Sequence, residues 1–267
     1  LTKMQKDDAE NYATFWSNFG RVIKEGVADP DYSEKVRDLL WFSSTAGSDM
    51  TSLASYVERM KDGQDSIYYI TGASREAVEK SPHIEAFLDK GYEVLFLTDP
   101  VDELMVGHLA EYQEKKLQSV GKGDVELGSD EERQEAEESR KAKQESHASL
   151  LELVQTSLDD HIKEVRLSAR LTSSAACLVG EDGDLSPGLE KLLSASGQDV
   201  QKQKRILEIN PEHPVLEKMQ TLFSTGEEGE VLEDYAHLLH GQALIAEGSN
   251  LPDPAAFARR VAELMIR

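Results

Sequence analysis

The chain has one cysteine, few prolines and no long apolar run. A single thiol, Cys177, excludes an internal disulfide and favours a reducing compartment, which we expect to be the cytoplasm. The longest apolar runs have only the length of a strand, so we expect no transmembrane helix and no membrane partner. The first residues already show a helical pattern and lack the features of a signal peptide. The chain also begins without methionine, which indicates a piece of a longer protein.

Positive charge is the other deficit. The sequence has 29 Lys and Arg against 51 Asp and Glu, giving a formal net charge of −22. Such a surface repels phosphate backbones, so we expect no nucleic-acid partner. The 267 residues are enough for two domains of ordinary size, and a hydrophobic content of 39% fits a globular protein with exposed helices.

The first part of the chain, residues 1–122, is predicted to be helical and then α/β. Over residues 1–62, apolar side chains recur at spacings of three and four, which indicates helices. From Ser66 the period changes, and short apolar runs at 67–71, 93–97 and 117–120 alternate with helical patterns. This alternation predicts a small three-stranded parallel sheet with helices on its faces, an αβα subdomain over residues 66–120.

A charged segment, residues 123–149, separates this part from a second domain over residues 150–267. The segment is rich in Glu, Lys, Ser and Gln, which favours a partly helical linker. Alternation over Val165–Leu171 predicts a half-buried strand, and Ala175–Val179 and Arg205–Ile209 are two further strand patterns. With the helices around them, these strands predict an α+β domain.

The last forty residues carry two helical patterns in succession. Gly248 can end the first helix in a left-handed conformation, and Asp253 with Pro254 can begin the second. Apolar residues occupy two faces of the first helix, and the second face also needs cover. A second copy would supply it in a four-helix bundle about a two-fold axis; the alternative is an ordinary helical hairpin docked on its own core. The predicted dimer-interface residues are Val231, Tyr235, Leu238, Leu239, Ile245, Phe257, Val261, Leu264 and Met265.

Another amphipathic helix is predicted from four leucines spaced i, i+4, i+7 and i+8. They are Leu185, Leu189, Leu192 and Leu193. On the pattern alone, a helix that faces its own core is the favoured interpretation, and a helix that offers its leucines to a partner is the alternative. Pattern alone leaves both possibilities open.

Few residues suggest chemistry. Asp102 and Glu103 fall in the first turn of a predicted helix, where carboxylates complement the helix dipole. No partner constellation accompanies them, so we predict no catalytic residue. His237 and His240 have a spacing that can ligate zinc, but no further ligand completes a set, so we predict no metal site. The alternative function is a small α/β enzyme with a ligand at the strand ends near Gly72 and Asp99.

Eight short strings point to a family. They are Asn11–Trp16, Tyr68–Gly72, Ser81–His83, Gly91–Leu95, Asp99–Glu103, Val165–Thr172, Leu207–Pro214 and Gln242–Gly248. In order and spacing they resemble the C-terminal half of the Hsp90 chaperones, most closely the bacterial type. The resemblance covers essentially the whole chain.

The resemblance implies that residues 1–122 end the family's middle domain and that 150–267 form its C-terminal dimerisation domain. It implies a homodimer that binds unfolded or partly folded client proteins in the stress response. The nucleotide-binding domain is absent, so we expect no enzyme activity and no cofactor in this piece, and ATP with magnesium only in the full-length parent. The implied client contacts are the leucine helix described above and Glu103, Leu104 and Met105. The family often has methionine at the positions of Leu185 and Leu189 and tryptophan at that of Leu104, so this chain departs from it there.

Overall fold

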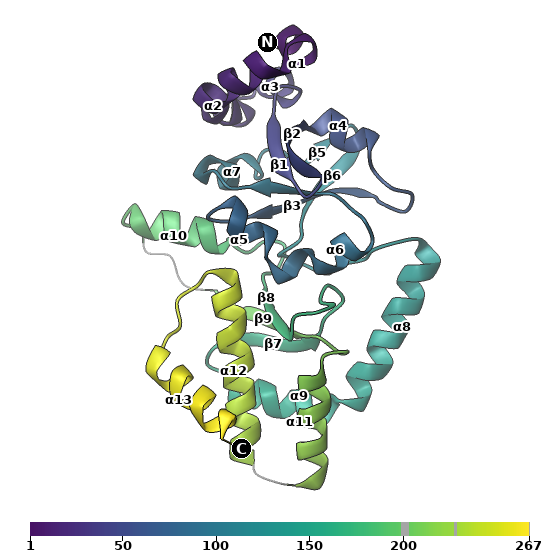
Figure 1. The fold of residues 1–267 in the computed structure, drawn as a ribbon, viewed down its shortest axis with the longest axis vertical. Coiled ribbons are helices and arrows are strands. Elements are labelled where there is room, and N and C mark those ends of the chain that lie inside the picture. The colour runs from purple at the N-terminus through teal and green to yellow at the C-terminus, as the bar shows by residue number, and fades with distance from the viewer. Residues whose placement is uncertain (199–202, 227–228, 267) are drawn as a thin grey trace. The chain divides into compact units, whose positions relative to one another are not determined.

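The computed structural model describes residues 1–198, 203–226 and 229–266, and the chain divides into two compact units (Figure 1). Unit 1 consists of residues 1–80, 87–120 and 188–200, and unit 2 of residues 81–86, 121–187 and 201–267. No helix in the described part of the chain is both long and apolar enough to cross a bilayer.

Unit 1 is built on a mixed sheet with the strand order β2-β1-β4-β3-β6-β5. The strands are β1 (Trp41–Ser44), β2 (Gly47–Ser52), β3 (Ser66–Thr71), β4 (Val94–Leu97), β5 (Glu111–Tyr112) and β6 (Lys115–Ser119). The central strand β3 runs parallel to β4 and to β6, and these three correspond to the three predicted strands. All four residues of β4 are buried, as expected of a strand covered on both faces.

The sheet is larger than predicted, and the prediction that residues 1–62 are helical is wrong for residues 41–52. There β1 and β2 form an antiparallel hairpin, and β1 also pairs with β4. Only Phe42 and Ser44 of β1 face the core, and this alternation is too short to stand out among small polar residues. The helical pattern between the second and third predicted strands, from Val101 to Tyr112, forms a helix only as far as Met105, and its last two residues belong to β5.

The helices of unit 1 are α1 (Thr2–Asp7), α2 (Ala9–Glu25), α3 (Ser33–Arg37), α4 (Leu53–Glu58), α5 (Arg75–Glu79) and α7 (Pro100–Met105), with a 3-10 turn η1 (Gly26–Ala28). Of these helices, α2 and α4 contribute aromatic side chains to the core of the unit. Tyr12 and Trp16 of α2 are buried in the same core as Phe42. The Tyr12 hydroxyl donates to the carbonyl of Leu39 at 2.5 Å, so this buried polar group is satisfied. The border between the units falls inside α6 (Glu85–Asp89) and α10 (Pro187–Ala195).

Unit 2 contains a three-stranded sheet with the order β7-β9-β8. Strand β7 (Ile162–Leu167) runs parallel to β9 (Arg205–Ile209), and β8 (Ala176–Val179) runs antiparallel to it. The strand predicted over 165–171 therefore begins and ends earlier. The unit also includes the 3-10 turn η2 (Pro82–Ile84), α8 (Asp130–Ser146), α9 (Ala148–Ser157), α11 (Pro214–Thr225), α12 (Gly229–Glu247) and α13 (Pro254–Met265).

The core of unit 2 lies where α9, α11 and α12 meet the sheet (Figure 1). Val154, Leu167, Leu207 and Ala236 are completely buried there. The α8 helix falls within the predicted charged segment and contacts the β7 edge. There the side-chain oxygen of Gln144 accepts the backbone N–H of Leu167 at 2.9 Å. This contact satisfies a donor on an otherwise open strand edge.

Candidate functional site

The terminal helix pair begins and ends as the sequence predicts. Gly248 has φ +79°, the left-handed conformation that ends α12. Asp253 accepts the backbone N–H of Ala256 at 2.9 Å and caps α13, which begins at Pro254. These two signals turn the chain back along α12.

Two contacts then hold α13 against α12. The Nε of Arg260 donates to Asp234 Oδ1 at 3.1 Å. Gly241 of α12 admits the ring of Phe257, because a Cβ atom at Gly241 would lie 2.5 Å from two ring carbons. The helices therefore approach closely only because this position has no side chain.

An apolar groove of about 370 Å³ lies between these helices and α11. It is lined by Val215, Tyr235, Leu238, Leu239, Gln242, Val261, Leu264 and Met265. No residue of α13 is buried, and Met265 and Ile266 are 81% and 86% exposed. An amphipathic helix whose apolar side chains stay in water is typical of an interface without its partner.

The predicted interface residues fall into two groups. Tyr235, Leu238, Leu239, Val261, Leu264 and Met265 line the groove, whereas Val231, Ile245 and Phe257 do not. Leu239 also belongs to the core and is only 3% exposed, and Ile245 is exposed outside the groove. The groove also includes Val215, which was not among the predicted residues because its helix, α11, lies outside the terminal pair. Exposed Ile266, just after α13, continues the apolar pattern of that helix.

The leucine helix α10 has no buried residue. Leu185, Leu189 and Leu193 are half-buried, and Leu192 is 39% exposed. Just before the helix, the backbone N–H of Leu185 donates to the side-chain oxygen of Gln203 at 2.9 Å. The four leucines thus lack the deep burial of core residues such as Leu207.

The start of α7 is organised by a buried ion pair. Lys24 of α2 is 5% exposed and contacts Asp102 Oδ1 at 2.7 Å and Asp99 Oδ2 at 2.8 Å. Burial raises the pKa of Asp102 despite Lys24. Burial also opposes the charge of Asp99, but hydrogen bonds from Lys24 and Arg21 outweigh it and lower the pKa of Asp99. Asp99 and Asp102 are therefore both explained by their contacts with Lys24, which hold the start of α7 against α2.

The three residues that follow differ in exposure. Leu104 is 54% exposed, Glu103 is half-buried, and Met105 is 1% exposed in the core of unit 1. This burial removes Met105 from the predicted client contacts, because a side chain inside the core has no surface to offer. The sequence shows that Met105 is apolar, but it does not show that residues of α2 and β1 share its core.

The strand ends proposed for an enzyme site are occupied by structural contacts. The Gly72 N–H donates to the Leu97 carbonyl at 3.1 Å, and a Cβ atom at Gly72 would lie 2.4 Å from Val78. Asp99 is engaged by Arg21 and Lys24. These contacts leave neither residue as an open ligand position.

In unit 2, two arginines share one buried carboxylate. Arg166 Nη2 lies 2.7 Å from Glu208 Oε1, and Arg170 Nε lies 2.9 Å from Glu208 Oε2. Burial would raise the pKa of Glu208, but the two guanidinium groups outweigh it and lower that pKa. Cys177 lies beside Glu208 in the sheet, and burial raises the pKa of its thiol. A thiol that stays protonated is a poor nucleophile.

Comparisons with known proteins agree on one family. The family model described as "Hsp90 protein" matches residues 1–267. The chain is 49% identical over 270 residues to "Chaperone protein HtpG" of Geobacter sulfurreducens, covering 100% of this chain and 41% of that protein. HtpG of Nocardia farcinica is 48% identical, with 98% of this chain and 42% of that protein covered. HtpG of Mycobacterium leprae is 47% identical, with 100% and 42% covered. The chain thus spans about two fifths of the length of these curated relatives, and it belongs to the Hsp90 family.

Proposed function

We propose that this chain is the dimerising and client-contacting part of an Hsp90-type chaperone. Residues 1–122 would end the middle domain, 123–149 would form the linker, and 150–267 would form the dimerisation domain. The observation that carries the proposal is the groove lined by Leu238, Val261, Leu264 and Met265, which leaves an apolar helix face without cover.

The occupant that fits this groove best is a second copy of the same helix pair. Two-fold dimers are the commonest oligomers, and a two-fold axis brings the same apolar surface of each copy together. Packing α12 and α13 of both copies would form a four-helix bundle and remove Met265 from water. Each fully buried methionine or leucine stabilises such a contact by roughly 1.5–3 kcal/mol.

A matched pair of variants tests this interface. Leu264→Asp places a charge in the groove, where burial without a partner costs several kcal/mol. Ala255→Asp adds the same charge at an exposed position of α13 outside the groove. Light scattering after gel filtration should give a monomer for the first and a dimer for the second. Equal masses for both variants would argue against the groove.

We further propose that clients contact Leu189, Leu192 and Leu193 of α10, with Leu104 and Glu103 of α7 as a second contact. The double change Leu189→Ser and Leu192→Ser should weaken suppression of a model client's aggregation while leaving the melting temperature nearly unchanged. Lys191→Ser, on the same helix, is the control. A large loss of stability in the double variant would show that the leucines of α10 belong to the core, and the proposed client contact would then be wrong.

We propose no nucleotide chemistry for this chain, which spans about two fifths of the length of its relatives. We expect this chain neither to bind nor to hydrolyse ATP, and ATP with magnesium to be used by the parent protein. A ligand at a hundred times its dissociation constant would stabilise the fold by about 2.7 kcal/mol. A saturable rise in melting temperature with ATP would overturn that expectation.

A further inference from the structure

Three histidines of unit 2 gather in one place. His237 and His240 lie one turn apart on α12, and His161 lies in the turn that leads from α9 into β7. The ring of His161 stacks on that of His240, with centroids 5.5 Å apart and an interplanar angle of 26°. It also meets the ring of His237 edge-on at 6.1 Å.

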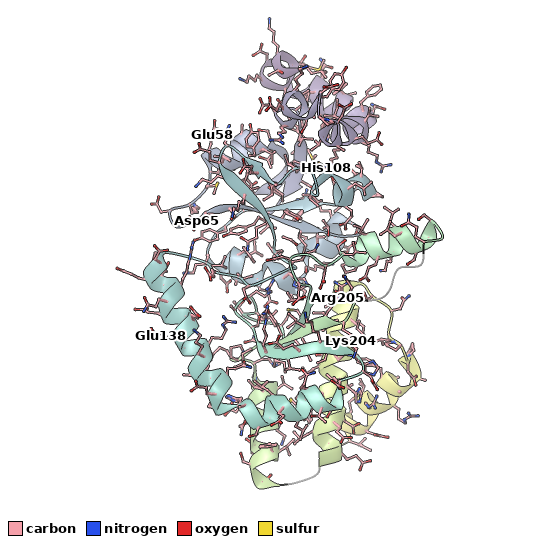
Figure 2. All side chains as sticks on the ribbon, turned by 180° about the vertical axis from the view of Figure 1, so that it is seen from behind. Glu58, Asp65, His108, Glu138, Lys204 and Arg205 are labelled. Carbon is pink, nitrogen blue, oxygen red and sulfur yellow. The ribbon has the colours of Figure 1, made fainter. Side chains whose placement is uncertain are left out.

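Local contacts fix the turn that carries His161. The backbone N–H of His161 donates to the carbonyl of Leu158 at 2.8 Å. Lys204, at the start of β9 (Figure 2), donates to the backbone carbonyl of Asp159 at 2.6 Å. The stacked ring is thus one contact between this turn and α12, beside the buried side chains of Leu158 and Ile162, which share a core cluster with residues of α12.

The charges around the cluster do not compensate a proton on His240. Glu233 and Asp234 share α12 with it, but Asp234 is already paired with Arg260 of α13. In the turn, Asp159 and Asp160 precede His161, and Lys204 donates to the Asp159 carbonyl. Within the described residues, no hydrogen bond or ion pair joins the three imidazoles to an acid.

Burial and neighbouring positive charges both favour the neutral form of His237 and of His240. His240 is 8% exposed, and burial, followed by His161 and His237, lowers its pKa to about 4. Burial, Arg260 and His161 also lower the pKa of His237. Within the described residues, no three histidine, cysteine or acidic side chains are arranged to hold a metal ion.

We propose that His161, His237 and His240 form an acid-sensitive clamp, which holds the α9–β7 turn on α12 at neutral pH and releases it on acidification. Protonation places like charges on stacked rings and charges a buried one, and opening the turn relieves both. Leu238 and Leu239, which line the groove, lie between two of the histidines on α12. An effect of acid on the dimer follows only if the proposed dimer interface is correct, whereas the clamp itself does not depend on it.

The sign of the effect follows from the pKa of His240. An unfolded histidine has a pKa near 6.5, so the unfolded chain binds more protons than the folded one between pH 6.5 and about 4. The contribution of His240 to the stability of the fold is therefore complete above pH 6.5, and it is lost as the pH falls from 6.5 to about 4. Between pH 7.5 and 5, His240 alone should raise the unfolding equilibrium constant roughly thirty-fold.

Histidine-selective NMR on the whole chain tests the clamp directly. The ring signal of His240, assigned with His240→Asn, should titrate well below pH 6. His161→Asn removes one neighbouring charge and part of the burial, so the His240 midpoint should then move upward. A midpoint near 6.5 in the wild type, or no shift in the His161→Asn variant, would overturn the proposal.

Urea unfolding at pH 7.5 and pH 5 supplies the second measurement. Buried His83, whose pKa is also lowered to about 4 by burial, contributes equally to every variant, so the comparison is between variants. His240→Asn should remove most of the thirty-fold change, while His108→Asn, an exposed position in unit 1 (Figure 2), should not.

An unchanged pH response in His240→Asn would contradict the clamp. If that variant does not fold, assignment of the His240 ring signal through its backbone resonances lets the wild-type titration decide. Light scattering at both pH values reports on the dimer separately.

Discussion

Arg170 and Glu208 form an ion pair that is almost completely shielded from solvent, with side chains 1% and 3% exposed and 2.9 Å between Nε and Oε2. Ser168 donates to the same carboxylate oxygen at 2.7 Å, and Arg166 engages the other oxygen. Both guanidinium groups also donate to the carbonyl of Gly123. One side chain on β9 thereby ties together β7, the loop after it and the beginning of the charged segment.

Removing this carboxylate should destabilise unit 2 strongly. Glu208→Gln leaves Arg170 buried without its counter-charge, and breaking one partner of a buried pair typically costs about 3–5 kcal/mol. The exposed pair between Lys143 and Glu212 is the control, and Glu212→Gln should cost at most about 1 kcal/mol. Urea denaturation gives both values. Similar small losses for both variants would show that the buried pair does not support the fold.

The same carboxylate predicts a dependence on acid. Because the folded-state pKa of Glu208 lies below its ordinary value, its contribution is present above the unfolded pKa of about 4.5. That contribution is lost as the pH falls through the folded value. The stability difference between wild type and Glu208→Gln should therefore shrink as the pH falls below about 4.5. A difference that stays constant down to pH 3 would contradict this assignment.

Removing either of two neighbouring carboxylates on α7 should cost very different amounts of stability. Asp102→Ala leaves buried Lys24 with Asp99 as its remaining partner and should cost about 3 kcal/mol. Glu103→Ala, one position along, removes a carboxylate from the first turn of α7 and should cost at most about 1 kcal/mol. Thermal melting of the two variants compares them. Equal losses would mean that the ion pair with Lys24 contributes nothing specific.

Gly241 should be intolerant of a side chain. Gly241→Ala introduces a methyl group 2.5 Å from the Phe257 ring, so α13 must shift, at a cost of about 1–3 kcal/mol. Gly229→Ala, in the same helix but with nothing within 4 Å, should be neutral or slightly stabilising. Gly241→Ala should also weaken the dimer, which a dilution series would detect. A dimer of unchanged affinity would show that the contact between Phe257 and Gly241 does not support the dimer interface.

Much of the fold was predictable because its signals are local. Gly248, Asp253 and Pro254 set the turn between the last two helices by their own backbone preferences. The parallel strands β3, β4 and β6 were visible as apolar runs, because strands buried on both faces need apolar residues throughout. The β1–β2 hairpin was missed because β1 has just two core-facing residues and β2 is mostly exposed.

The candidate site was less predictable, because hydrophobicity does not say what covers a side chain. Met105 and Leu104 are adjacent apolar residues, yet one is in the core and the other in water. Leu239 and Met265 were predicted together as interface residues, but Leu239 already packs on its own domain. Burial of this kind depends on partners far away in the sequence, such as α2 for Met105.

Sedimentation equilibrium of the unaltered chain at micromolar concentration tests the central claim most directly. The groove between α11, α12 and α13 predicts a species of twice the 29.7 kDa chain mass, which dissociates only on strong dilution. A single species of 29.7 kDa at that concentration would contradict the account, because the apolar face of α13 would then have no second copy to cover it.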